Sequence, residues 1–355
     1  MGNSKPVMGH LTARSAVLSF ARNGKAGMGA GRPSGQHSGM GKLALNSSPI
    51  PHHSSPFTLH PSPFTPHRCI LLLLVVLISG CSTLMLGYRH ADTYLTWRAD
   101  SYFDLDPNQR RDFDARLAHL LSWHRYEQLP EYAGFLSTAI GRAQPGLKHD
   151  DIVWFVDGIK ARYRVVIDRF VGDAAEMLSN LSPAQITSLQ KQWKQDNRKF
   201  VREYELEGTL GDRKLARLRR TLSQIEDWTG DLTPEQQRRI AMLLDPIPHI
   251  NHFRHQDRIR RQNEFLDLLR LRANRNEFQR RLHAWLRDWE LGRTPEYARI
   301  SNEVYEKRIR FYIAVDTLLT AAQRQTAQKR LHRFVEDFKS LSVRPESCCL
   351  HDRPR

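Results

Sequence analysis

Cysteine is scarce in this chain of 355 residues, which has only Cys69, Cys81, Cys348 and Cys349. So few cysteines, spaced in this way, exclude a disulfide-stabilised scaffold. In an oxidising compartment Cys348 and Cys349 could bridge to another chain or to each other, but a bond between neighbours closes a strained ring. We therefore assign this pair to a C-terminal tail, 343–355, and expect no function for it.

Acidic residues are absent from residues 1–80, which contain seven of the 54 lysines and arginines. The rest of the chain has 47 basic and 38 acidic residues, so it accounts for +9 of the net charge of +16. These charges are interleaved over many segments, which favours a solvated mixed surface over a nucleic-acid interface. We expect no nucleic-acid partner.

Long hydrophobic runs are also lacking, apart from Ile70–Ile78. This run is too short to cross about 30 Å of hydrocarbon as a helix, but it has the length of the apolar part of a signal peptide. It leads into Leu77-Ile78-Ser79-Gly80-Cys81, which resembles the lipobox of bacterial lipoproteins. A buried apolar strand that ends in cysteine is the other interpretation.

The lipobox resemblance implies a signal peptide at 67–80 that is cut between Gly80 and Cys81. A thiolate is needed for the thioether to diacylglycerol, so Cys81 is the predicted lipidation site. Diacylglycerol and an N-acyl chain on Cys81 are the only bound groups that we expect, and together they suffice for stable anchoring. Ser82 in the next position suggests sorting to the periplasmic face of the outer membrane, with the inner membrane as the other option.

Residues 1–66 precede the signal peptide and are unlike the rest of the chain. Eight of the 18 prolines and nine of the 20 glycines fall before Cys69, together with clusters of serine and histidine. Such a composition cannot build a core. We interpret 1–66 as a disordered extension or as sequence upstream of the true translation start.

Strand-like alternation is nearly absent after Cys81, where apolar residues recur at helical spacing. In 183–204, for example, Ile186, Leu189 and Trp193 fall on one stripe with Phe200 and Tyr204. These stripes must pack against one another, so the sequence predicts an all-α fold of roughly ten amphipathic helices in an irregular antiparallel array. The expected helices are 107–126, 130–142, 150–178, 183–206, 212–228, 234–244, 251–273, 275–290, 295–318 and 321–341.

Four of these helices begin with the same pattern. Each start has Leu, then Asp, Ser or Thr as the N-cap, then Pro or Ala at the first helical position, and Gln three residues after the cap, as in a capping box. The spacing of these starts is uneven, which argues against a regular solenoid. Pro246 and Pro248 mark a boundary between two helical halves, 105–245 and 246–342. The four starts are Leu105–Gln109, Leu181–Gln185, Leu232–Gln236 and Leu319–Gln323.

The anchor and juxtamembrane segment, 81–104, carries the richest local signature. Residues 80–92 read G-C-S-x-x-x-L-x-Y-x-x-A-D, and an aromatic stretch leads to Y-F-D-L at 102–105. This signature resembles a family of all-helical proteobacterial lipoproteins defined only as a domain of unknown function. The resemblance extends over the mature chain. It implies a fold class and an envelope location, but no activity.

Several aromatic residues lie within about twenty positions of the predicted lipid, and they form a candidate interface. They could sit at the level of the lipid headgroups, where amphipathic rings are favoured, or fold back onto the first helices. Asp92, Asp100 and Asp104 would be poor neighbours for an anionic surface, so we favour folding back. The candidate interface residues are Tyr88, Asp92, Tyr94, Trp97, Tyr102 and Phe103.

Two further groups of residues are candidate sites. His249, His252 and His255 recur at steps of three, but they are weak metal candidates because the third falls round the helix and no suitable carboxylate or cysteine is near. The basic segment Arg254–Arg281 could contact anionic envelope components, although Glu264, Asp267 and Glu277 interrupt it. We expect no metal site and interpret the basic segment as a solvated helix face. Asp112 and Asp114, near His119 and His124, are interpreted as helix surface.

Common catalytic signatures such as G-x-S-x-G, H-E-x-x-H and the phosphate-binding glycine loops are missing. The sequence therefore predicts a non-catalytic envelope lipoprotein that is tethered to a membrane and binds another envelope protein or an envelope polymer. A steric chaperone for a secreted client is a sharper version of this hypothesis. An enzyme that acts on lipid or peptidoglycan is the competing one.

Overall fold

The computed structural model describes residues 83–344. The predicted extension and signal peptide, the cleavage and lipidation site at Gly80 and Cys81, the sorting residue Ser82, and the vicinal pair Cys348 and Cys349 lie outside these residues. Expectations about them stay predictions.

The described chain is all-α, as predicted, and no strand occurs within residues 83–344. Each predicted helix is present, with ends that differ by no more than three residues from the expected ones. The helices are α5 (Pro107–Trp123), α6 (Leu129–Ala143), α7 (His149–Ser179), α8 (Pro183–Glu203), α9 (Leu210–Thr229), α10 (Pro234–Leu244), α11 (Asn251–Arg270), α12 (Arg275–Arg287), α13 (Pro295–Leu318) and α14 (Ala321–Ser342).

Two features differ from the sequence prediction. The segment behind the predicted anchor forms α3 (Thr83–Arg89) and α4 (Ala91–Phe103). The expected gap between α5 and α6 is filled by one π-helical turn, η1 (His124–Gln128), so the helix runs on from α5 into α6. Pro130 has no N–H to donate, so it cannot continue the α-helical hydrogen bonding, and the wider π turn before it accommodates this break.

The four repeated helix starts are capping boxes. Asp106, Ser182, Thr233 and Thr320 each accept a hydrogen bond from the backbone N–H three residues on. The glutamine at that position returns a side-chain bond to the backbone of the cap residue in each case. These local bonds explain why the helix starts could be placed from sequence.

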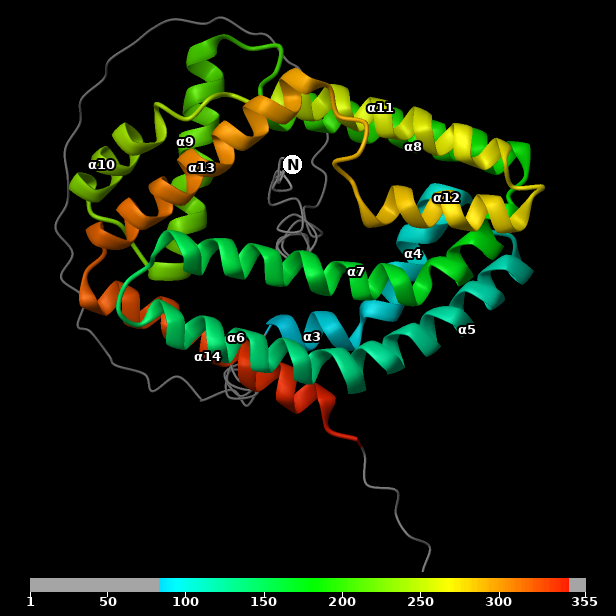
Figure 1. The fold of residues 1–355 in the computed structure, drawn as a ribbon, viewed down its shortest axis with the longest axis horizontal. Helices are drawn as coiled ribbons and strands as arrows, with labels where there is room; N and C mark the ends of the chain where they lie inside the picture. Colours follow the sequence, from blue (N-terminus) through cyan, green and yellow to red (C-terminus); the bar gives the residue numbers. More distant parts are fainter. Residues whose placement is uncertain (1–82, 345–355) are drawn as a thin grey trace, which may run out of the picture.

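The helices are arranged around a ring-like frame (Figure 1). α8 and α11 run side by side along one edge, and α7, α6 and α14 form the opposite one. α6 packs most extensively against α14, and α7 against α12, so the main pairings join segments far apart in sequence. No described helix combines the length and the apolar character needed to cross a membrane.

The core is divided into clusters along this frame. One large cluster joins α9, α10 and α13, and the other joins α7, α8, α11 and α12. The first also takes in Ile247 and Ile250, which lie in the link that was expected to divide two halves. Smaller clusters join α6 to α14 and α7 to α13.

Candidate functional site

The candidate interface residues divide into those that fold back onto the body and those that stay exposed. The hydroxyl of Tyr88 on α3 and Nδ1 of His124 form a hydrogen bond of 2.9 Å, and the two rings stack. Burial raises the pKa of Tyr88 to about 12 and lowers the pKa of His124 to about 4. Both groups are therefore neutral near pH 7, which suits a buried hydrogen bond between them.

Tyr102 and Phe103, at the end of α4, also turn inward. The Tyr102 hydroxyl donates to Asp196 on α8 at 2.5 Å and accepts from Arg98 at 2.8 Å. Burial, followed by the hydrogen bond to Asp196, raises the pKa of Tyr102. Phe103 packs against the cluster of α7, α8, α11 and α12.

Of the other candidate interface residues, Trp97 and Asp92 lie toward solvent, and Tyr94 is partly buried. Trp97 keeps 58% of its surface exposed, with Arg98 over its ring at 5.8 Å and Tyr94 beside it at 5.9 Å between ring centroids. Asp92 is exposed in the first turn of α4, where it accepts from the backbone N–H of Thr93. The six residues therefore do not form one surface.

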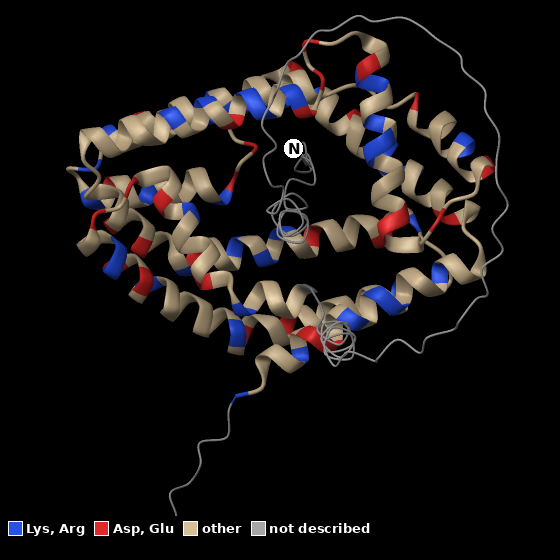
Figure 2. Ribbon diagram, turned by 180° about the vertical axis from the view of Figure 1, so that it is seen from behind, with Lys and Arg blue, Asp and Glu red and all other residues tan. Residues whose placement is uncertain are grey.

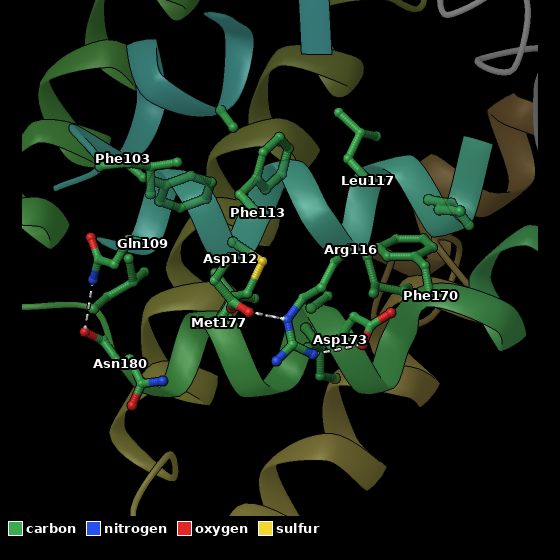
Figure 3. Close-up of a pocket in the computed structure, with 18 of the residues that line it drawn as sticks. Phe103, Gln109, Asp112, Phe113, Arg116, Leu117, Phe170, Asp173, Met177 and Asn180 are labelled. Atoms are coloured by element: carbon green, nitrogen blue, oxygen red, sulfur yellow. Dashed lines mark hydrogen bonds and ion pairs between the residues drawn. The ribbon is translucent and has the colours of Figure 1, made fainter. Parts of the chain in front are cut away.

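Phe103 forms part of the wall of an apolar pocket with a volume of about 320 Å³ (Figure 3). The other walls come from α5, α7, α11 and α12, and nearly all of the lining is hydrocarbon. Pockets of this size and character are typical binding sites for apolar groups. The principal apolar lining residues are Leu105, Phe113, Leu117, Leu120, Phe170, Ala174, Met177, Phe265, Leu282 and Leu286.

A charged network closes one side of this pocket. Arg116 bonds to Asp112 at 2.9 Å on its own helix, and to Asp173 at 2.7 Å and Glu176 at 3.0 Å on α7. Figure 3 shows Arg116 between Asp112 and Asp173 at the pocket wall. The bonds to these carboxylates, that to Asp112 first, raise the pKa of Arg116. One guanidinium faces three carboxylates, so this rim carries excess negative charge.

The three candidate histidines, His249, His252 and His255, lie in different surroundings. His249 lies among basic residues, and burial and the nearby Arg217 lower its pKa to about 4. His255 stacks on Phe200, and His252 is exposed. In the region from Thr83 to Arg344, no group of three or more His, Cys, Asp or Glu side chains is placed to hold a metal ion.

The acids that interrupt the basic segment Arg254–Arg281 pair with its arginines. Glu264 accepts from Arg260, Asp267 from Arg270 at 2.6 Å, and Glu277 from both Arg280 and Arg281. Figure 2 shows basic and acidic bands interleaved along the helices.

Sequence reasoning missed the pocket because its walls come from α4, α5, α7, α11 and α12, which meet only when the chain is folded. Asp112 was interpreted as part of a helix surface, and the i, i+4 pair that it forms with Arg116 was the available local signal. Asp114 instead accepts from Thr96 on α4 at 2.6 Å.

Comparison with known proteins supports the resemblance at the level of a family. No curated protein and no solved structure matches the chain. Residues 101–298, from the end of α4 into α13, match a family of unknown function, DUF6279. This match includes every lining residue of the pocket except Ala99. It spans more than half of the chain, which therefore belongs to the DUF6279 family.

Proposed function

We propose that this chain is a lipid-anchored, non-catalytic binding module of the bacterial cell envelope, and that the apolar pocket is its binding site. The observation that carries the proposal is the pocket itself, a hydrocarbon-lined hollow of about 320 Å³. Phe103 in its wall lies at the end of the segment 81–104 that follows the predicted anchor at Cys81, and Leu105 comes directly after that segment. A ligand held there would lie close to the tether along the chain.

The charge beside the pocket indicates what kind of partner fits it. Asp112, Asp173 and Glu176 all bond to Arg116, which leaves net negative charge at the rim. Because these carboxylates are held in ion pairs, they are better suited to attracting a basic partner than to acid–base catalysis. The partner that we infer is another envelope protein, with apolar side chains that enter the pocket and a basic residue that meets the rim.

A neutral, environment-sensitive dye such as N-phenyl-1-naphthylamine tests whether the pocket is open to apolar groups. We expect its fluorescence to rise on addition of the full chain and to stay low with Ala174→Phe, because the larger side chain fills the pocket. Ala322→Phe, at an exposed position on α14, is the matched control and keeps the signal. Equal fluorescence from the two variants would exclude the pocket as the dye site.

The partner itself is tested in cells with a photo-crosslinking amino acid at position 113, which lines the pocket. The matched control is position 333, which is exposed on α14. The proposal requires a crosslinked protein that appears from position 113 alone and disappears when Ala174→Phe is added. The same products from both positions would contradict it.

The anchor is tested separately from the pocket. Cells grown with radioactive palmitate should label the chain, and Cys81→Ala should abolish the label, because the thioether needs the thiol. A chain that stays unlabelled and retains its apolar run would remove the envelope location. That outcome would not affect the dye result, so the anchor and the pocket are tested independently of each other.

A further inference from the structure

A second hollow, on the side of the molecule formed by α9 and α10, differs in chemistry from the apolar pocket. Its volume is about 310 Å³, and its walls combine Lys214 and Arg217 with the apolar side chains of Leu218 and Leu244. Asp245 completes the lining at the end of α10. The hollow is therefore apolar on one wall and basic on another.

Two of the five basic residues of α9, Lys214 and Arg217, line this hollow. Arg213 and Arg220 donate instead to the carbonyls of Gly208 and Glu203, and Figure 2 shows a concentration of basic bands on this helix. Arg308 of α13 lies close enough to Arg217 that, after burial, it contributes most to lowering the pKa of Arg217. His249 faces the same group and is held neutral near pH 7 by burial and by Arg217.

Negative charge on this side is limited. Asp245 pairs with Lys214 at 2.7 Å, and both side chains are substantially exposed. Asp212 is engaged at the start of α9, where it accepts from the backbone N–H and the hydroxyl of Thr209. The one carboxylate of the lining, Asp245, therefore faces two lining cations, with Arg308 close to Arg217, and an anion would relieve the repulsion between these cations.

Arg217 is fixed in place for such a role. Its Nη1 donates to the backbone carbonyl of Ile247 at 2.6 Å, which restricts the side chain of this lining residue to one position. Its Nε is buried without an acceptor in the structure, and Nε2 of His249, which lies outside the lining, is buried without a hydrogen-bond partner. Buried donors without partners are costly, and they recur where a ligand completes the hydrogen bonding.

We propose that this hollow binds a phosphate monoester. Arg217 and Lys214 hold the phosphate oxygens, and the organic group lies against Leu218 and Leu244. Arginine suits this role because its planar guanidinium can bond two phosphate oxygens at once, and lysine adds a mobile charge. Asp245 competes with the phosphate for Lys214 and therefore weakens binding.

The test is calorimetric titration of the full chain with phenyl phosphate. We expect binding that inorganic phosphate reproduces more weakly and phenol does not, because only the ester offers both the charge and the apolar group. Lys214→Gln should weaken binding by about tenfold, and Asp245→Asn should strengthen it severalfold, by removing the competitor. Arg219→Gln, at an exposed position on the same helix and outside the lining, is the matched control and should bind like wild type.

The opposite signs expected for Lys214→Gln and Asp245→Asn separate binding from folding, since loss of structure would weaken both. Absence of heat from phenyl phosphate, or equal affinity in Lys214→Gln and Arg219→Gln, would overturn the proposal. Phosphatidylcholine vesicles with and without phosphatidic acid then distinguish the two sources of the ester. Capture by phosphatidic acid that depends on Lys214 assigns a lipid headgroup, and binding of phenyl phosphate alone assigns a soluble ester.

Discussion

Gln109 and Gln185, the third residues of two helices far apart in sequence, bond directly to each other. Nε2 of Gln185 lies 2.5 Å from Oε1 of Gln109, and Nε2 of Gln109 lies 3.3 Å from Oε1 of Gln185. Gln109 also donates to the backbone carbonyl of Asn180, just before α8. Gln185 likewise donates to the carbonyl of Asp104, just before α5. The two capping boxes are therefore joined into one unit.

The same device joins α10 and α14. Gln236 and Gln323 bond through their amides at 2.8 Å, and they donate to the carbonyls of Leu318 and Asp231. In each pair the accepting carbonyl stands two residues before the cap of the partner helix. The repeated start pattern thus encodes pairing between helices as well as helix initiation.

Removing one of these glutamines should reduce stability. Gln185 is buried, and Gln185→Ala would leave the N–H of Ser182 and the carbonyl of Asp104 without their partner. We expect the free energy of unfolding to fall by about 1–3 kcal/mol, measured by urea denaturation. Gln256→Ala, at an exposed position on α11, should change it by less than about 0.5 kcal/mol. Equal stability of the two variants would show that the paired boxes contribute nothing.

A glycine fixes the approach of α7 to α6. A Cβ atom at Gly158 would lie 2.3 Å from the ring of Phe135, which is itself packed between Trp154 and Phe155. Gly158→Ala should therefore lower the free energy of unfolding by about 1–3 kcal/mol, as overpacking does.

The control for this substitution is Gly134→Ala on α6, where a Cβ would meet nothing within 4 Å. It should raise the thermal midpoint, because alanine favours a helix over glycine by about 1 kcal/mol. Calorimetric melting of both variants measures the contrast, and a shift of the same sign in both would refute the packing argument.

Stability should fall in mild acid because of His124. Burial lowers the pKa of His124 to about 4 from the usual 6.5, so the unfolded chain binds more protons between these values. The free energy of unfolding therefore decreases as the pH falls from about 6.5 to about 4, and this contribution is fully present above that range. His249 has a pKa lowered to a similar value and adds a slope of the same sign.

The variant His124→Gln should flatten this dependence in part, since Tyr88 would face a side chain that does not titrate. Urea denaturation across this pH range measures the slope. His119→Gln, at an exposed position on the preceding helix, should leave it unchanged. An unaltered slope in His124→Gln would assign the acid sensitivity elsewhere.

Two phenylalanines should respond differently to truncation. Phe278 is fully buried in the cluster of α7, α8, α11 and α12 beside the pocket, and Phe278→Ala should cost about 3–5 kcal/mol of unfolding free energy. Phe113 lines the pocket and is only half-buried, so Phe113→Ala should cost about half as much or less. Comparable losses by denaturant titration would indicate that the pocket is closed in solution.

The sequence predicted helices well where the starting bonds are local. The caps at Asp106, Ser182, Thr233 and Thr320 are read from adjacent residues, and the helices behind them were placed correctly. α4 was missed because it packs against both α5 and α8, so its apolar residues do not form one stripe. Its N-cap, His90, also makes no side-chain capping bond.

The pocket could not be predicted for a related reason. Ala174 and Leu282 face the same hollow only because α7 packs against α12, and no local pattern specifies that pairing. The aromatic segment was a better signal, since it led to Tyr88, Tyr102 and Phe103, which do fold back. It also included Trp97, which does not.

The packing of α6 against α14 has a consequence for how the chain acquires its shape. α6 ends at Ala143 and α14 begins at Ala321, so roughly half of the chain must be synthesised between the two partners. Contacts at such separation form late, because the entropy of closing a long loop is lost before the contact compensates for it. During biosynthesis, Ala133 and Ile140 would stay without the Val335 side chain against which they pack. α14, the last helix of the described residues, is the one that completes the ring.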